Sequence, residues 1–174
     1  MWRRAERYPL KTPLEPIQNP IAPPPGVRLL SEKLNMSVPN EHYLFFDNHG
    51  RLSIVRRYDQ PDGQGPVYEQ NDFPLMFLDW FAPAIREFRK PVGDRPTRFM
   101  STVPEAVGDE MLTLERGMAV GGDDEPGYIV NNWSRGRQLT GLEGHFIPMS
   151  VAWTETFIFD GGLLKLLALA KSRL

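Results

Sequence analysis

The sequence predicts one mixed α+β domain with antiparallel strands and two to four helices, preceded by an extended proline-rich arm. Three observations lead to this fold class: a hairpin pattern, apolar stripes at helical spacing, and the lack of a regular alternation of strands and helices. The chain has 174 residues, of which 41% are hydrophobic, so it can bury one core. We assign residues 1–26 to the arm and residues 27–174 to the globular domain.

The arm is predicted from its proline content. The segment from Tyr8 to Gly26 holds seven of the 17 prolines. Each proline removes a backbone donor and pushes the residue before it toward extended geometry, so we expect a polyproline-II-like strap. Burying an aliphatic side chain could contribute roughly 1.5–3 kcal/mol. We therefore expect four aliphatic residues to dock the arm, either on its own domain or on a neighbouring subunit: Leu10, Leu14, Ile17 and Ile21.

The clearest local pattern in the domain is a β-hairpin. Two runs rich in aromatic and β-branched residues, 42–46 and 51–58, flank the sequence Asp47–Gly50. Asn and Gly accept the positive φ that tight hairpin turns require. Before the hairpin we expect a short helical turn over Gly26–Leu34, and after a loop we expect a third short strand at Val67–Gln70.

The strongest helical pattern spans Asn71–Lys90, where Asn71 or Asp72 can cap the first turn. Pro83 removes a backbone donor inside this pattern, so we expect it to kink the helix or to split it in two. Four apolar residues recur there at helical spacing and predict one buried stripe: Phe77, Phe81, Ile85 and Phe88.

The second half of the chain is predicted to hold a helix, two strands and a final helix. Ser101–Gly117 combines a capping-box pattern with apolar residues on one helical face. Strand-like runs follow at 128–133 and 145–159, and Pro148 should lie at a sheet edge or a bulge. Leu163–Arg173 is apolar nearly all round, which is typical of a helix buried in a core.

Charge is unevenly distributed along the chain. The net charge is −2, but residues 59–130 carry 14 Asp and Glu against six Lys and Arg, while both flanking segments are mildly basic. The basic residues are scattered, whereas a nucleic-acid binder normally has a dense basic face, so we expect no nucleic-acid partner. An acidic centre suits a basic protein partner, although the same charges also suit solvated loops. The contacts expected with a partner are Asp59, Asp62, Asp123, Asp124, Glu125, Arg135 and Arg137.

The sequence argues against several catalytic chemistries. It contains no cysteine, which excludes thiolate nucleophiles, disulfides and Cys-ligated metal sites. No GxSxG or HExxH motif and no phosphate-cradling glycine loop occurs, so we expect no metal centre and no cofactor. The first residues lack the apolar run of a secretory signal, and the most apolar stretch, Leu163–Ala170, is shorter than the ~20 residues of a membrane span. We therefore expect a cytoplasmic protein without a membrane span.

The span from Tyr43 to Phe88 resembles one half of the SUKH-type bacterial immunity fold. In that fold an aromatic strand, a turn, a second strand, an acidic glycine-containing loop and an aromatic helix follow one another. The corresponding residues are Tyr43, Phe46, Gly50, Tyr58, Phe73, Phe77 and Trp80. The resemblance covers about a quarter of the chain and implies a role in neutralising another protein.

These observations predict a non-enzymatic, bacterial-type cytosolic protein that works by binding another protein. The most concrete version is an immunity or inhibitor protein that neutralises a basic toxin or effector through an acidic surface. Two alternatives stay open. One is a small hydrolase-like enzyme that uses Asp or Glu as acid and base. The other is a structural or assembly subunit of a phage or secretion machine, whose arm docks on a neighbour in a homo-oligomer.

Overall fold

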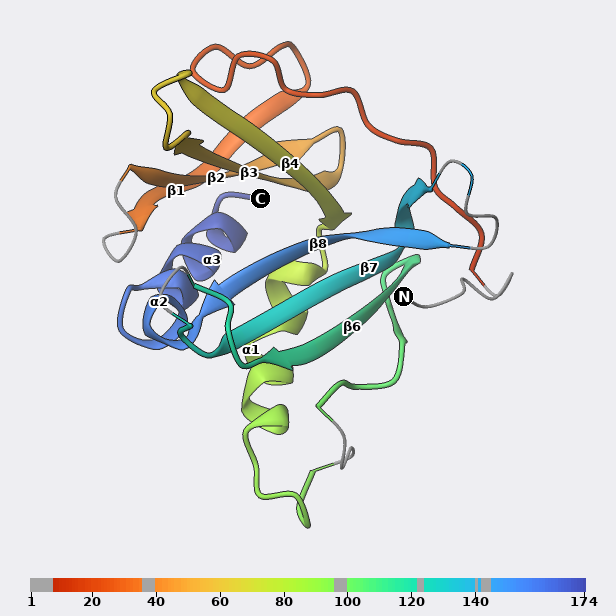
Figure 1. The fold of residues 1–174 in the computed structure, drawn as a ribbon. Helices are drawn as coiled ribbons and strands as arrows, with labels where there is room; N and C mark the ends of the chain where they lie inside the picture. Colours follow the sequence, from red (N-terminus) through yellow and green to blue (C-terminus); the bar gives the residue numbers. More distant parts are fainter. Residues whose placement is uncertain (1–7, 36–39, 96–99, 122–123, 140, 142–144) are drawn as a thin grey trace.

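Two four-stranded antiparallel sheets and three helices make up the fold in the computed structural model (Figure 1). The structure describes residues 8–35, 40–95, 100–121, 124–139, 141 and 145–174. Within these residues the architecture is mixed α+β with antiparallel strands and three helices, which confirms this part of the predicted fold class.

The first sheet is a meander in the order β1-β2-β3-β4, formed by β1 (Val27–Asn35), β2 (Glu41–Asn48), β3 (Arg51–Asp59) and β4 (Pro66–Pro74). The predicted hairpin is confirmed as β2 and β3, joined at His49 and Gly50, which both adopt positive φ. The helical turn predicted over Gly26–Leu34 is wrong. Apart from one irregularity at Leu30, this stretch pairs with β2 along the whole of β1, and the backbone hydrogen bonds of the ladder outweigh a weak local preference.

The second sheet is also a meander, formed by β5 (Glu105–Val107), β6 (Glu110–Gly117), β7 (Gly127–Gln138) and β8 (Phe146–Thr154). The helix predicted over Ser101–Gly117 is wrong. Leu112 and Leu114 are both fully buried, which is the period of two of a strand, and Gly108 adopts positive φ in the turn between β5 and β6. Pro148 lies in the edge strand β8, beside an irregularity in the pairing with β7, as predicted.

A helical segment follows each meander. α1 (Phe77–Phe88) comes after β4, and α2 (Glu155–Phe159) and α3 (Leu163–Ser172) come after β8. The predicted stripe of α1 is buried, but the helix begins later than predicted because Asn71–Pro74 pair with β3 and complete β4. Pro83 lies inside α1 without splitting it. The run at 145–159 is a strand only as far as Thr154, whose side chain accepts a hydrogen bond from Phe157 and caps α2.

The main core lies where the inner faces of the two sheets meet the helices. Trp153 of β8 is at its centre and is surrounded by four aromatic rings at centroid distances of 5.2–6.4 Å: Tyr43, Phe45, Phe77 and Phe81. A smaller apolar cluster, which includes Ile17, covers part of the opposite face of the first sheet, where the later part of residues 8–26 crosses it (Figure 1). The centre of the first sheet is therefore covered on both faces, while its last strand, β4, remains an edge.

Candidate functional site

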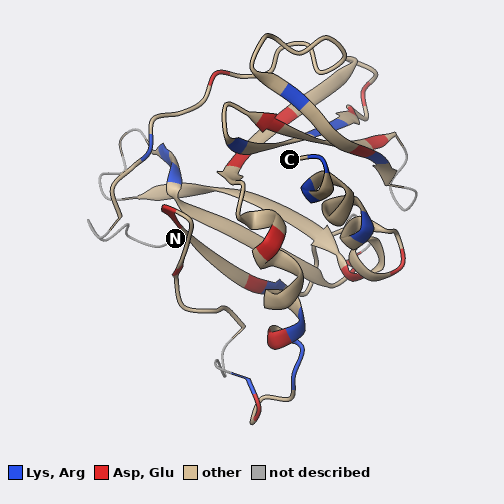
Figure 2. Cartoon of the chain, turned by 180° about the vertical axis from the view of Figure 1, so that it is seen from behind, with Lys and Arg blue, Asp and Glu red and all other residues tan. Residues whose placement is uncertain are grey.

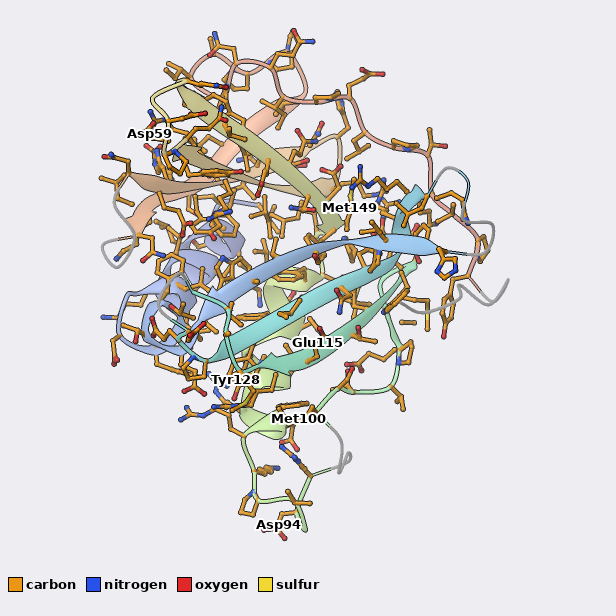
Figure 3. The ribbon with its side chains drawn as sticks, viewed as in Figure 1. Asp59, Asp94, Met100, Glu115, Tyr128 and Met149 are labelled. Carbon is orange, nitrogen blue, oxygen red and sulfur yellow. The ribbon has the colours of Figure 1, made fainter. Side chains whose placement is uncertain are left out.

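The two sheets touch along their edge strands and then diverge. β4 and β8 are each the last strand of their sheet. They meet where the Ser150 backbone N–H donates to Asn71 Oδ1 at 3.3 Å and where the Asp72 backbone N–H lies 3.4 Å from Met149 Sδ. From there the strands separate, with Met149 at the closed end and Asp59 toward the open end in Figure 3. We call the space between β4 and β8 the wedge.

A cavity of about 330 Å³ lies in the wedge. Its walls come from the first sheet, from the loop after β6 and from β8: Asn35, Glu41, Tyr43, Ile54, Arg56, Glu69, Asn71, Val120, Gly121 and Ser150–Thr154. One wall belongs to the first meander and the other to the second, so the cavity exists only when both halves of the chain are folded together.

Both strands turn backbone hydrogen-bonding groups toward the wedge. The N–H groups of Ser150 and Asp72 point across it, and alternate residues of a strand point the same way, so Ala152 on β8 and Gln70 on β4 do so too. No described strand pairs with these two edges. Unpaired edges are templates for an added strand, and proteins commonly blunt them with Lys or Pro. β8 has neither residue type between Met149 and Thr154.

A buried ion pair forms the polar wall of the cavity. The Glu41 side chain is only 4% exposed, and its carboxylate accepts hydrogen bonds from Arg56 Nε at 2.7 Å and from Asn35 Nδ2 at 2.8 Å. Arg56 also reaches Glu69 at 3.3 Å and stacks over the Tyr58 ring at 4.4 Å from its centroid. Burial disfavours the charge on Arg56, but the neighbouring acidic groups outweigh it and raise the pKa of Arg56. Glu69, 45% exposed, is the carboxylate of this wall that solvent reaches.

Two aromatic residues line the inner part of the cavity. Burial, reinforced by the charge of Glu41, raises the pKa of Tyr43 above the ordinary tyrosine value, so its phenol stays neutral. Trp153 is 2% exposed, and its indole Nε1 is buried without a hydrogen-bond partner among the described residues. A buried donor left unsatisfied costs about 1–3 kcal/mol. A ligand that supplied an acceptor to Trp153 would remove this cost.

The predicted acidic contacts lie on two loops. Asp59 ends β3, and Asp62 follows in the loop that leads to β4. Asp124 and Glu125 lie in the loop after β6, and residues of the same loop line the cavity. Asp123 lies outside the described residues. None of the described acidic contacts lines the cavity: Asp59 pairs with Arg57 at 2.9 Å, and Glu125 accepts a hydrogen bond from the Thr156 backbone N–H at 3.2 Å.

The two predicted arginines are placed differently from each other. Arg135 is 4% exposed, and its Nε donates to Glu110 at 2.9 Å. Its charge is therefore paired inside the molecule and is not exposed to a partner. Arg137 is exposed and lines a different hollow, which also includes Pro13 and Ile147.

The arm residues differ in burial as well. Ile17 is 5% exposed and packs against three residues on the outer face of the first sheet: Leu44, Phe46 and Val55. Leu14 is half-buried. Leu10 and Ile21 are exposed, at 47% and 91%. Among the four predicted docking residues, Ile17 therefore makes the buried apolar contact.

The arm also forms polar contacts with both sheets. The Lys11 backbone N–H donates to the Ser134 carbonyl at 2.8 Å, and the Ile17 backbone N–H donates to Gln70 Oε1 at 2.8 Å. Arg135 donates to the Thr12 carbonyl at 2.9 Å. These bonds tie the arm to β7 of the second sheet and to β4 of the first.

A buried polar network joins the two sheets next to the arm. Asp72 of β4 is 1% exposed, and its carboxylate accepts hydrogen bonds from Ser53 at 2.5 Å and from Gln70 at 3.0 Å. Asn132 of β7 donates to the Asp72 carbonyl at 2.9 Å and to the Glu110 carboxylate at 2.5 Å. Burial raises the pKa of Asp72, and the hydrogen bonds only partly oppose this effect.

The residues that form the wedge were not among the predicted contacts. The hairpin turn sets the register of β2 and β3, which places Tyr43 opposite Arg56, and β4 places Glu69 opposite Arg56 on the other side. The turn sequence fixes the hairpin register, so it could have predicted that Tyr43 lies opposite Arg56. No local signal in the sequence indicates that Trp153 of the second sheet lies against them.

No protein-family model matches the chain, and comparisons with curated proteins and with solved structures give no match either. The resemblance of Tyr43–Phe88 to SUKH-type immunity proteins therefore depends on the aromatic pattern alone. Within the described residues, no helix is long and apolar enough to cross a membrane. The same part of the chain holds no group of three His, Cys, Asp or Glu side chains arranged to bind a metal ion.

Proposed function

We propose that this protein binds another protein by accepting an extended, basic segment of it in the wedge between β4 and β8. The observation that carries the proposal is the pair of unpaired strand edges that diverge around a cavity of about 330 Å³. A segment lying along β8 would exchange main-chain hydrogen bonds with Ala152 and direct alternate side chains into the cavity. Strand addition of this kind combines main-chain affinity with side-chain specificity.

The charges around the wedge favour a basic segment. Arg56 pairs with two carboxylates, Glu41 and Glu69, so these three side chains carry a net charge of −1, and Glu69 is the exposed carboxylate of the cavity wall. Asp124 adds negative charge on the loop after β6, and Asp59 lies before β4 in an ion pair with Arg57, whereas Figure 2 shows Lys and Arg dispersed over both sheets and the helices. A Lys or Arg side chain in the cavity would lie near Glu69, and the acidic loops would speed the approach of a basic partner.

The carboxylates of the cavity wall favour a binding function over a catalytic one. Acid–base chemistry, the alternative, needs a carboxylate free to exchange a proton with a substrate. Glu41 is instead held by Arg56 and Asn35, and Glu69 is bound by Arg56 and by the Tyr58 hydroxyl at 2.9 Å. A non-enzymatic immunity or inhibitor protein against a basic toxin or effector remains the most concrete version of the proposed function.

We also infer that the arm is a strap for its own domain. Ile17 is buried on the first sheet, and Lys11 and Thr12 bond to the second sheet. These contacts favour docking of the arm on its own domain over docking on a neighbour, although Leu10 and Ile21 stay exposed.

Selection from a library of short random peptides tests the proposed function. Selection on the wild-type protein should enrich extended sequences in which Lys or Arg alternates with β-branched residues. Binding of a selected peptide should weaken about tenfold in Glu69→Lys, because the substitution reverses a charge at the cavity wall. The matched control is Glu87→Lys, since Glu87 is a comparably exposed carboxylate on α1, and this variant should leave binding unchanged. Peptides without basic residues, or equal binding to both variants, would contradict the proposal.

A further inference from the structure

A second pocket, of about 340 Å³, opens beside the C-terminal end of α1, away from the wedge. It is lined by three arginines, one carboxylate and two aromatic rings: Arg89, Arg95, Arg116, Glu155, Phe88 and Tyr128. Figure 3 labels Tyr128, and Figure 2 shows basic residues along the segment that follows α1. The pocket thus has three positive charges against one negative charge, in a protein whose net charge is −2.

Each of the three guanidinium groups stacks on an aromatic ring. The distances from the guanidinium carbon to the ring centroid are 4.1, 5.0 and 5.4 Å, for Arg89 on Phe159, Arg95 on Phe88 and Arg116 on Tyr128. Arg95 also donates to the Phe88 carbonyl at 2.9 Å. Stacking of this kind restricts a long side chain before any ligand arrives, so less conformational entropy is lost when a ligand binds.

The positive charges of this pocket are only partly compensated. Arg116 bonds to Glu155 at 2.6 Å and to the Tyr128 hydroxyl at 3.0 Å. Neither Arg89 nor Arg95 lies within ion-pair distance of a carboxylate in the described part of the chain. In addition, Arg95 Nε is buried and has no hydrogen-bond partner among the described residues. Like charges held close together and a buried unsatisfied donor both favour the entry of an anion.

We propose that this pocket binds a phosphate group, either as free phosphate or as a phosphomonoester of a larger ligand. The planar fork of a guanidinium matches two phosphate oxygens at once, and such charge-assisted bonds are roughly twice as strong as neutral ones. A dianion offsets the excess of two positive charges that the pocket holds. The Nε–H of Arg95 then gains the acceptor that it lacks within the described residues.

Titration with inorganic phosphate, and separately with O-phosphoserine, tests the proposal at constant ionic strength. The arginine Nε–H and backbone amide signals are followed by NMR. We expect saturable shifts at Arg89, Arg95 and Arg116 with at least one of the two ligands. Tighter binding of O-phosphoserine identifies a phosphomonoester as the ligand, and equal or tighter binding of inorganic phosphate identifies the free ion.

The double variant Arg89→Gln, Arg95→Gln should lose about tenfold or more in affinity, because two of the three guanidinium donors are removed. Arg86→Gln is the matched control, since Arg86 is an exposed arginine of α1 that does not line the pocket. Both residues of the double variant lie outside the buried core, so a circular dichroism spectrum like that of the wild type is expected. Shifts that grow linearly without saturation, or equal affinity in the double variant and the wild type, would overturn the proposal. Neither residue contributes to the wedge, so this result is independent of peptide binding.

Discussion

Replacing Ile17 by alanine should lower the free energy of unfolding by about 2–3 kcal/mol. Ile17 is 5% exposed, and the substitution removes three carbons, each worth roughly 0.8 kcal/mol when buried. The cavity left against Leu44, Phe46 and Val55 adds to this loss. Because the arm lies on the surface and can settle into the space, the cost falls in the lower part of the usual range of about 2–5 kcal/mol.

The same substitution at Ile21 is the matched control. Ile21 lies in the same arm, loses the same atoms and is 91% exposed, so Ile21→Ala should change stability by less than about 0.5 kcal/mol. Urea unfolding followed by tryptophan fluorescence measures both variants, provided that the denaturant slope stays constant. If Ile17→Ala is as stable as Ile21→Ala, the arm does not stabilise the domain and the strap inference fails.

Three further predictions concern the buried charges. Arg56→Leu leaves the buried Glu41 carboxylate without its ion-pair partner and should lower the free energy of unfolding, measured with urea at neutral pH, by about 2–4 kcal/mol. The double variant Arg56→Leu, Glu41→Leu should recover most of that loss. The raised pKa of Tyr43 means that the folded state holds the phenolic proton more tightly than the unfolded state, so stability should fall as pH rises above about 10. Thermal melts measure this fall, and Tyr43→Phe should not show it. The raised pKa of Asp72 means that the free energy of unfolding should fall as pH rises from about 3.9 toward the pKa of Asp72 in the folded state. In Asp72→Asn the free energy of unfolding should change less over this pH range.

Local chemistry explains which elements the sequence could predict. The β2–β3 hairpin follows from its turn residues, and the buried stripe of α1 follows from four residues spaced along one face. The failure over Ser101–Gly117 has a physical reason. Val103, Val107 and Met111 are four apart and fit one helical face, but the turn at Gly108 places Val107 in β5 and Met111 in β6. Backbone pairing with β7 stabilises β6 as a strand instead of a helix.

The wedge depends on contacts that no local pattern records. Glu41, Arg56 and Glu69 come from three strands, and their contact requires the register of the first sheet. The approach of β8 to β4 requires the two meanders to pack against each other. Arg135 shows the converse: its sequence neighbourhood suggests an exposed loop, whereas Glu110 from β6 binds it inside the molecule.

The most direct test of the proposed function is amide hydrogen exchange at Ala152, measured with and without a peptide selected on the wild-type protein. If the peptide adds a strand to the free edge of β8, exchange of the Ala152 amide should slow about tenfold or more at saturation. The Leu169 amide on α3, remote from the cavity lining, should keep its rate. An unchanged Ala152 rate with saturating peptide would place the peptide elsewhere and contradict binding in the wedge.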